Sequence, residues 1–145
     1  MTRISEFLTA DHRRCDALFG EAAQAAESGD WERCRLRLEA FRAALRDHMA
    51  SEEEVLFPAF EQATGTASGP TRVMRYEHQQ MLELLGQLDA ALRARDARGF
   101  SERAASFSAL MAAHSAKEEN VLYPLCDEAL PGVTGESLQR RACAK

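Results

Sequence analysis

Apolar residues recur at helical spacing along most of the chain, in stretches separated by short polar breaks. The stretches are rich in Ala, Leu, Glu, Arg and Gln, which favour helices, and β-branched residues are few. The breaks are rich in turn-forming residues and read "ESGDW" at 27–31, "TGTASGP" at 64–70 and "RDARGF" at 95–100. This pattern predicts helices over residues 5–27, 30–62, 70–94 and 97–129.

Particular residues mark the ends of these helices. Asp30 and Asp96 each follow a break, and an aspartate there accepts hydrogen bonds from the first N–H groups of a helix. Pro58 and Pro124 fall inside the second and fourth predicted helices. Because proline lacks an N–H donor and crowds the preceding turn, each should kink its helix or begin a separate short turn.

Short connections between long amphipathic helices predict an all-α fold, an antiparallel up-down-up-down four-helix bundle. The bundle would occupy residues 1–130. After Pro131 the remaining residues, 131–145, have weak periodicity and are expected to form a C-terminal tail that frays.

Composition narrows the class of protein. The 145 residues are 46% hydrophobic and 28% charged, which is a globular profile, and no apolar run is long enough to span a membrane. The N-terminus lacks the apolar core of a signal peptide, so a cytoplasmic location is expected. The net charge of -5 and the absence of a basic stripe argue against nucleic acid as a partner. The cysteines form no CxxC pair and should be free thiols.

The chain contains an internal repeat. Residues 12–63 align without a gap on residues 78–129, so that the two halves look like one helical hairpin written twice. All four histidines take part: His12 aligns with His78, and His48 with His114. Scattered surface histidines would have no reason to obey one offset. Glu52 likewise aligns with Glu118, four residues after a histidine in each half.

The repeat predicts that these side chains meet. His12 and His48 lie at nearly equal separations from the turn at Gly29, and with a rise of about 1.5 Å per residue both belong at one level of the bundle. His78 and His114 are placed in the same way about Arg95. The residues around each histidine on its own face are mostly apolar, which predicts burial; Leu82 and Val121 are among them.

Buried carboxylates among imidazoles favour a metal site, because a buried carboxylate is costly unless it is paired or bound to a metal. We expect one ion to bind His12 and His48, a second to bind His78 and His114, and Glu52 and Glu118 to bridge them. Since the carboxylates cancel only two of four positive charges, a bridging hydroxide or oxo group should complete the centre. Imidazoles and carboxylates without thiolates form a borderline nitrogen and oxygen donor set. Each ion would keep an open position. We assign no separate organic cofactor and no catalytic residue.

The sequence resembles the hemerythrin-like proteins of the HHE cation-binding family. The resemblance rests on "DH" at 11–12, "HMASEEEVLFP" at 48–58, "EH" at 77–78 and "HSAKEENVLYP" at 114–124. It implies a four-helix bundle around a non-haem di-iron centre that binds dioxygen or related small molecules. Oxygen carriers of the family have a fifth histidine where this chain has Met74. Water, Tyr76, Glu53 or Glu119 could take the position that this histidine leaves.

Residues beside the ligands have two interpretations each. Surface salt bridges are the favoured interpretation of Asp11, Glu53, Glu77 and Glu119, and hydrogen bonding to the ligand histidines is the alternative. Phe57 and Tyr123 are expected in the core, although Tyr123 could donate a proton or electron. For Gly20 and Gly86 we favour close helix contact over a passage for small molecules.

Several functions fit this centre. We favour binding or sensing of dioxygen or nitric oxide in an oxidative or nitrosative stress response. The alternatives are a redox enzyme that reduces peroxide or nitric oxide with an unknown electron donor, repair of iron centres or iron donation, and a structural or storage site for zinc or manganese. The chain is expected to be a monomer or a homodimer.

Overall fold

The computed structural model describes residues 2–143, with side chains up to residue 140. The elements in chain order are the helices α1 (Ile4–Glu27) and α2 (Trp31–Ala50), the π-helical turn η1 (Ser51–Leu56), the helices α3 (Phe57–Thr64), α4 (Pro70–Arg93) and α5 (Ala97–Lys117), the π-helical turn η2 (Glu118–Leu122), and the helices α6 (Tyr123–Ala129) and α7 (Gly135–Cys143). The prediction of an all-α chain is confirmed, and the predicted helix limits hold to within a residue or two.

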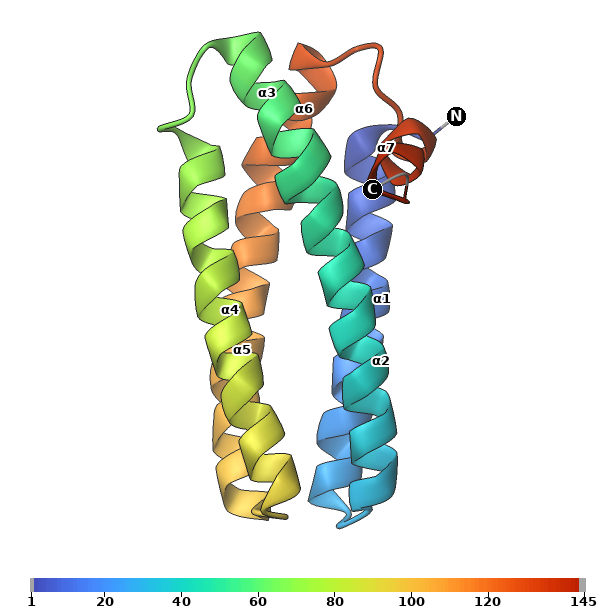
Figure 1. The fold of residues 1–145 in the computed structure, drawn as a ribbon, viewed down its shortest axis with the longest axis vertical. Coiled ribbons are helices and arrows are strands. Elements are labelled where there is room, and N and C mark those ends of the chain that lie inside the picture. The colour runs from blue at the N-terminus through green and yellow to red at the C-terminus, as the bar shows by residue number, and fades with distance from the viewer. Residues whose placement is uncertain (1, 144–145) are drawn as a thin grey trace.

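The long helices lie side by side along one axis (Figure 1). α1 is followed by the continuous segment α2–η1–α3, then by α4 and by the segment α5–η2–α6, and the chain reverses direction at each connection (Figure 1). Among the described residues, none of the helices combines the length and apolar character needed to cross a bilayer.

The helix starts follow the predicted chemistry. Asp30 accepts a hydrogen bond from the Arg33 N–H at 3.1 Å, and Asp96 accepts one from the Gly99 N–H at 3.0 Å, so both predicted N-caps are confirmed. The reversal after α1 uses Gly29 in the left-handed conformation, with φ of 76°. Its counterpart in the repeat, Arg95, adopts a φ of 52°, where a side chain costs about 1–2 kcal/mol.

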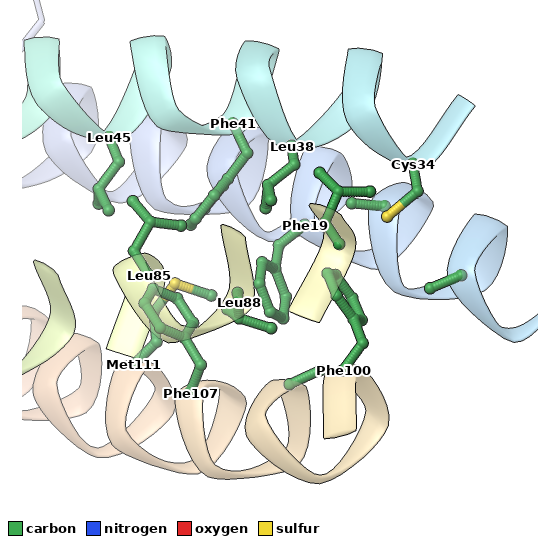
Figure 2. Packing of buried hydrophobic residues seen from close by; sticks show 14 of the residues in the cluster. Phe19, Cys34, Leu38, Phe41, Leu45, Leu85, Leu88, Phe100, Phe107 and Met111 are labelled. Atoms are coloured by element: carbon green, nitrogen blue, oxygen red, sulfur yellow. The ribbon is translucent and has the colours of Figure 1, made fainter. Parts of the chain in front are cut away.

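The apolar interior is divided into two parts. The larger cluster lies toward the turns at Gly29 and Arg95 and is centred on Phe19, Phe41 and Phe107 (Figure 2). The Phe19 and Phe107 rings stack with centroids 4.9 Å apart. The smaller cluster lies at the other end and draws on α1, η1, α3, α4, η2, α6 and α7. The histidines belong to neither cluster and lie between them.

The C-terminal tail departs from expectation. We predict that it frays, and for Gly135–Cys143 that prediction is wrong, because these residues form α7. Leu138 is fully buried in the smaller cluster. The Gly135 N–H donates to the Thr2 carbonyl at 2.9 Å, and the Thr2 N–H donates to Glu136 at 2.9 Å. These partners lie at the far end of the chain, so local periodicity could not reveal them.

Exposure also corrects part of the predicted core. Leu82 and Val121 share faces with ligand histidines in the sequence, yet they are 44% and 54% exposed. Val55, the counterpart of Val121 in the repeat, is buried in the same cluster as Leu138 of α7. The cysteines whose side chains are described, Cys15, Cys34 and Cys126, are buried and free. The side chain of Cys143 lies outside the described residues.

Candidate metal centre

The glutamate of each His-x-x-x-Glu motif lies in a π-helical turn. The Phe57 N–H donates to the Glu52 carbonyl and the Tyr123 N–H donates to the Glu118 carbonyl, five residues back in each case. Pro58 and Pro124 come directly after these donors, in the first turns of α3 and α6. At each proline the sequence predicts a kink or a separate short turn. The structure instead has a π turn before the proline and a new helix that includes it. The π turns were not predicted, although proline six residues after each glutamate was a visible signal.

The structure brings the six predicted ligand residues together. His12 comes from α1, His48 from α2, His78 from α4 and His114 from α5, and all are at most 5% exposed. Glu52 and Glu118 come from the π turns and are fully buried. The ring centroids of His12 and His48 are 4.7 Å apart, and those of His78 and His114 are 4.9 Å apart. The two pairs therefore form matching halves of one polar layer.

Each glutamate faces histidines of both halves. Glu118 Oε1 lies 3.3 Å from the Nε2 atom of His114, on its own helical segment, and 3.0 Å from that of His12 across the bundle. Glu52 Oε1 lies 3.5 Å from the Nε2 atom of His48 and 3.0 Å from that of His78. The carboxylates thus stand between the two histidine pairs.

The outer nitrogen of every ligand histidine contacts another carboxylate. Within a hairpin, the Nδ1 atom of His48 lies 3.1 Å from Asp11, and that of His114 lies 2.8 Å from Glu77. Between hairpins, the Nδ1 atom of His12 lies 2.7 Å from Glu119, and that of His78 lies 2.5 Å from Glu53. The favoured interpretation of these four carboxylates as mere surface salt bridges is therefore wrong, and the alternative is correct.

Cationic side chains hold three of these four outer carboxylates in turn. Glu119 accepts a hydrogen bond from Arg13 at 2.7 Å, Asp11 from Arg14 at 2.9 Å, and Glu77 from Lys117 at 2.5 Å. A carboxylate fixed in this way accepts the Nδ1–H proton of its histidine. The Nε2 lone pair of each ring then points inward, toward Glu52 and Glu118.

The inner atoms need a positive charge. A neutral histidine that donates through Nδ1 has only a lone pair at Nε2, and a carboxylate oxygen cannot donate to it. Within the described residues, His78 Nε2, Glu52 Oε1 and Glu118 Oε2 are buried without a hydrogen-bond partner. A proton or a metal ion would satisfy them. The donor set of imidazoles and carboxylates fits a borderline divalent ion such as iron.

The pKa shifts of His48, His78 and Glu52 also indicate that a positive charge is favoured at this site. Burial alone would lower the pKa of His78, but the carboxylates of Glu52 and Glu53 raise it to about 9. Against the same effect of burial, Glu52 and Asp11 raise the pKa of His48 well above its usual value. Burial would raise the pKa of Glu52, but His48 and the hydrogen bonds around the carboxyl lower it well below its usual range. The carboxylates of the site thus favour a positive charge on His48 and His78.

Two overlapping groups have the spacing that a metal ion requires. In one, ligand atoms of His12, His48, Glu52 and Glu118 lie within 4.8 Å of one another. In the other, those of His78 and His114 do so with the same two glutamates. Because both groups share Glu52 and Glu118, the arrangement fits two ions bridged by carboxylates.

Tyr123 lies inside this layer, where core packing alone would not place a hydroxyl. Its hydroxyl donates to Glu52 Oε2 at 2.6 Å and lies 3.1 Å from His12 Nε2. Burial and the adjacent Glu52 raise the pKa of Tyr123 well above its usual value. The sequence allows a role for Tyr123 as a proton or electron donor, and its place beside Glu52 and His12 is compatible with that role. Tyr76, the tyrosine considered for an open metal position, is instead 65% exposed and is excluded.

A cavity of about 10 Å³ adjoins all four histidines on the side of the larger apolar cluster. This is roughly the space that one water requires. Its walls include Leu45 and Met49, which also line an open groove between α2 and α4. They also include Asp16, Met111 and Ser115, which line the opposite groove between α1 and α5. The centre is thus enclosed but lies close to two surfaces.

Gly20 and Gly86 line these two grooves, one each. A Cβ atom at either position would meet nothing within 4 Å. The favoured interpretation of close helix contact is therefore wrong. A passage for small molecules through either groove stays a prediction.

Comparison with known proteins adds a family and one relative. The model of the hemerythrin HHE cation binding domain matches residues 3–126. The iron-sulfur cluster repair protein YtfE of Edwardsiella ictaluri (strain 93-146) is 44% identical over 50 residues. The alignment covers 34% of this chain and 23% of that protein, so the chain spans less than a quarter of the relative. No solved structure matches.

Proposed function

Because the chain belongs to the hemerythrin HHE cation-binding family, we propose that it holds two iron ions and binds dioxygen or nitric oxide at them. His12 and His48 would hold one ion, His78 and His114 the other, with Glu52 and Glu118 as bridges. The observation that carries the proposal is the pair of overlapping ligand groups that share both glutamates. An adjacent pair of redox-active ions can supply electrons to a small molecule.

We place this centre in an antiparallel up-down-up-down four-helix bundle. The continuous segments α2–η1–α3 and α5–η2–α6, packed beside α1 and α4, support that arrangement (Figure 1). Such bundles commonly hold di-iron sites between facing helices. The cytoplasmic location, and the choice between monomer and homodimer, stay predictions.

The surrounding residues would serve the site in three ways. Asp11, Glu53, Glu77 and Glu119 orient the histidines through Nδ1, so that every Nε2 points inward. The apolar walls formed by Met49, Met81 and Met111 restrict water to a space of about one molecule. The Tyr123 oxygen, 2.6 Å from Glu52 Oε2, fixes the place of that carboxylate. These features favour small, uncharged ligands.

Repair of iron centres is the second candidate function. It is supported by the similarity to the relative named an iron-sulfur cluster repair protein. On this alternative, the enclosed site would take up nitric oxide or release iron to a damaged cluster. Reduction of peroxide or nitric oxide remains a variant of the same chemistry that needs an external electron donor.

A loading experiment tests the proposal. The metal-free chain is given ferrous iron without oxygen, the bound metal is counted, and dioxygen or nitric oxide is then added and removed in an optical cell. We expect two irons per chain and a visible absorption band that forms with the gas. A band that disappears on removal of the gas indicates a carrier or sensor, and irreversible oxidation favours redox or repair chemistry.

The alternatives are separated by adding a second protein. A cluster-containing enzyme inactivated by nitric oxide is incubated with the iron-loaded chain, and recovery of its cluster absorption is measured. The metal-free chain is the control. Recovery that requires the iron-loaded form would establish repair, whereas full stability with zinc and no response to either gas would contradict both functions.

A further inference from the structure

We propose that Tyr123 is a further metal ligand, which binds through its phenol oxygen the ion held by His12 and His48. The inference rests on the two-metal site proposed above. It adds a residue that neither the family match nor the relative assigns, and it makes the two halves of the centre chemically unequal.

The position of the hydroxyl carries the inference. Its oxygen lies 2.6 Å from Glu52 Oε2 and 3.0 Å from Glu118 Oε1. It also lies 3.1 Å from His12 Nε2 and 3.5 Å from His48 Nε2. These four side chains are the members of the first ligand group. One oxygen therefore contacts every residue that would hold this ion.

The distances match a shared coordination sphere. Metal bonds to imidazole nitrogen or carboxylate oxygen measure about 2.0–2.2 Å. At right angles around one ion, neighbouring ligand atoms then lie about 3 Å apart. All four contacts of the Tyr123 oxygen are close to this value. A hydroxyl that merely supported one glutamate from outside would approach one ligand and stay distant from the rest.

Burial and charge agree with this position. Tyr123 is fully buried, so bulk water cannot reach its hydroxyl as a competing partner. Two divalent ions carry four positive charges, and Glu52 and Glu118 balance two of them. On binding, the O–H bond breaks, the proton leaves to solvent, and the phenolate balances a third charge. No electron is transferred in this step.

The repeat provides an internal control. Phe57 takes the place of Tyr123 in the other half. Its ring stacks on His78 with a centroid distance of 5.9 Å, as the Tyr123 ring stacks on His12 at 5.6 Å. The two rings therefore occupy equivalent places, but only one carries an oxygen. The ion of His78 and His114 would keep this position open for a small molecule.

The test is optical and does not depend on activity. The full chain is loaded with two irons and oxidised, and its visible absorption and resonance Raman spectra are recorded. A ferric phenolate gives a charge-transfer band, and excitation in that band enhances tyrosine ring vibrations. We expect both signals, loss of both in Tyr123→Phe, and a gain in band intensity in Phe57→Tyr. Tyr76→Phe, the control at the other tyrosine, should leave the spectra unchanged.

Several outcomes overturn the inference. Two bound irons without enhanced ring vibrations in the unsubstituted chain would do so, and this measurement needs no folded variant. A band that persists in Tyr123→Phe with two irons bound would also do so. Metal analysis separates this failure from failure of the two-metal site, since fewer than two irons in the unsubstituted chain contradicts the site itself. With one iron bound, the ring vibrations still decide whether Tyr123 is a ligand.

Discussion

The two helical hairpins carry the same candidate ligands in different surroundings. His12, His48 and Glu52 have direct counterparts in the second half, with closely similar distances to their partners. The positions next to the ligands differ, with Tyr123 opposite Phe57 and buried Val55 opposite exposed Val121. The comparison teaches that the repeat sets the pattern of histidines and glutamates, whereas single substitutions and the C-terminal helix make the halves unequal.

α7 accounts for the largest difference in packing. It covers η1 and α1, where Val55 and Leu138 share one buried cluster. In the second hairpin the counterparts of Val55 and Phe7 are Val121 and Val73, which are 54% and 47% exposed. Equivalent positions of the repeat are therefore wholly or partly buried in the first hairpin, where α7 covers them, and exposed in the second.

Removal of a bridging carboxylate should have the largest effect. We expect Glu52→Ala and Glu118→Ala each to lose most of both metal ions, because each glutamate faces histidines of both halves. Metal analysis after anaerobic loading checks this, with the exposed Glu128→Ala as control. If each variant instead kept one ion, the glutamates would serve separate halves and the bridging assignment would be wrong.

The pH dependence should come next in size. Because the pKa of His78 is raised to about 9, its protonated form stabilises the metal-free fold fully below about pH 6.5, the unperturbed value, and this contribution is lost as the pH rises toward 9. His48 and His114 are shifted in the same direction. Over the same range, metal affinity should rise as the protons leave Nε2.

Thermal unfolding of metal-free and zinc-loaded protein checks both statements. As the pH rises from about 6.5 to 9, the unfolding temperature of the metal-free chain should decrease. The difference in unfolding temperature between the zinc-loaded and metal-free forms should increase over the same range. A midpoint of the metal-free chain that rises over this range would contradict the assigned protonation of the histidines.

The paired valines test the effect of α7. Val55→Ala should cost about 1.5 kcal/mol for the two lost methyl groups, plus a cavity cost. Val121→Ala should change stability by no more than about 0.5 kcal/mol, since its side chain is 54% exposed. Urea unfolding measures both. Equal costs would show that a partner or a second copy covers Val121 in solution.

The outer carboxylates test whether the two halves orient their histidines equally. Asp11→Asn and Glu77→Gln should each weaken metal binding roughly tenfold to 100-fold, because each removes the acceptor at Nδ1 of a ligand histidine. Zinc titration against a chelator measures the loss. Asp47→Asn, an exposed charge beside His48, is the control. A similar loss of zinc affinity in Asp47→Asn would show that the effect comes from the overall negative charge and not from the hydrogen bond at Nδ1.

The repeated glycines should give the smallest effect. Gly20→Ala and Gly86→Ala are each expected to stabilise the chain by about 0.5–1 kcal/mol, because alanine favours a helix and the added Cβ meets nothing. Gly135→Ala is the contrasting variant, since its Cβ would collide with Phe7. Denaturant unfolding distinguishes them. If Gly20→Ala or Gly86→Ala were destabilised, a neighbouring helix would lie close to that glycine, contrary to the structure.

Much of the fold and the location of the site followed from local patterns. The helix limits, the caps at Asp30 and Asp96, and the shared level of the four histidines depend on helical period and on separation from a turn. The roles of Glu53, Glu119 and Tyr123 did not follow, because their positions about the helix depend on the π turns. One extra residue per turn rotates all later side chains relative to the α-helical pattern.

The sequence by itself determined the all-α class and the duplicated His and Glu positions, since helical period and internal repetition are properties of neighbouring residues. The tertiary structure decided which carboxylate orients which histidine, because His12 and Glu119, or His78 and Glu53, meet only after the hairpins pack. It also decided the place of α7 and the approach of the Tyr123 hydroxyl to one half of the site. These contacts join residues that lie far apart in the chain. They are strengthened by burial, which depends on the packing of the helices and cannot be read from neighbouring residues.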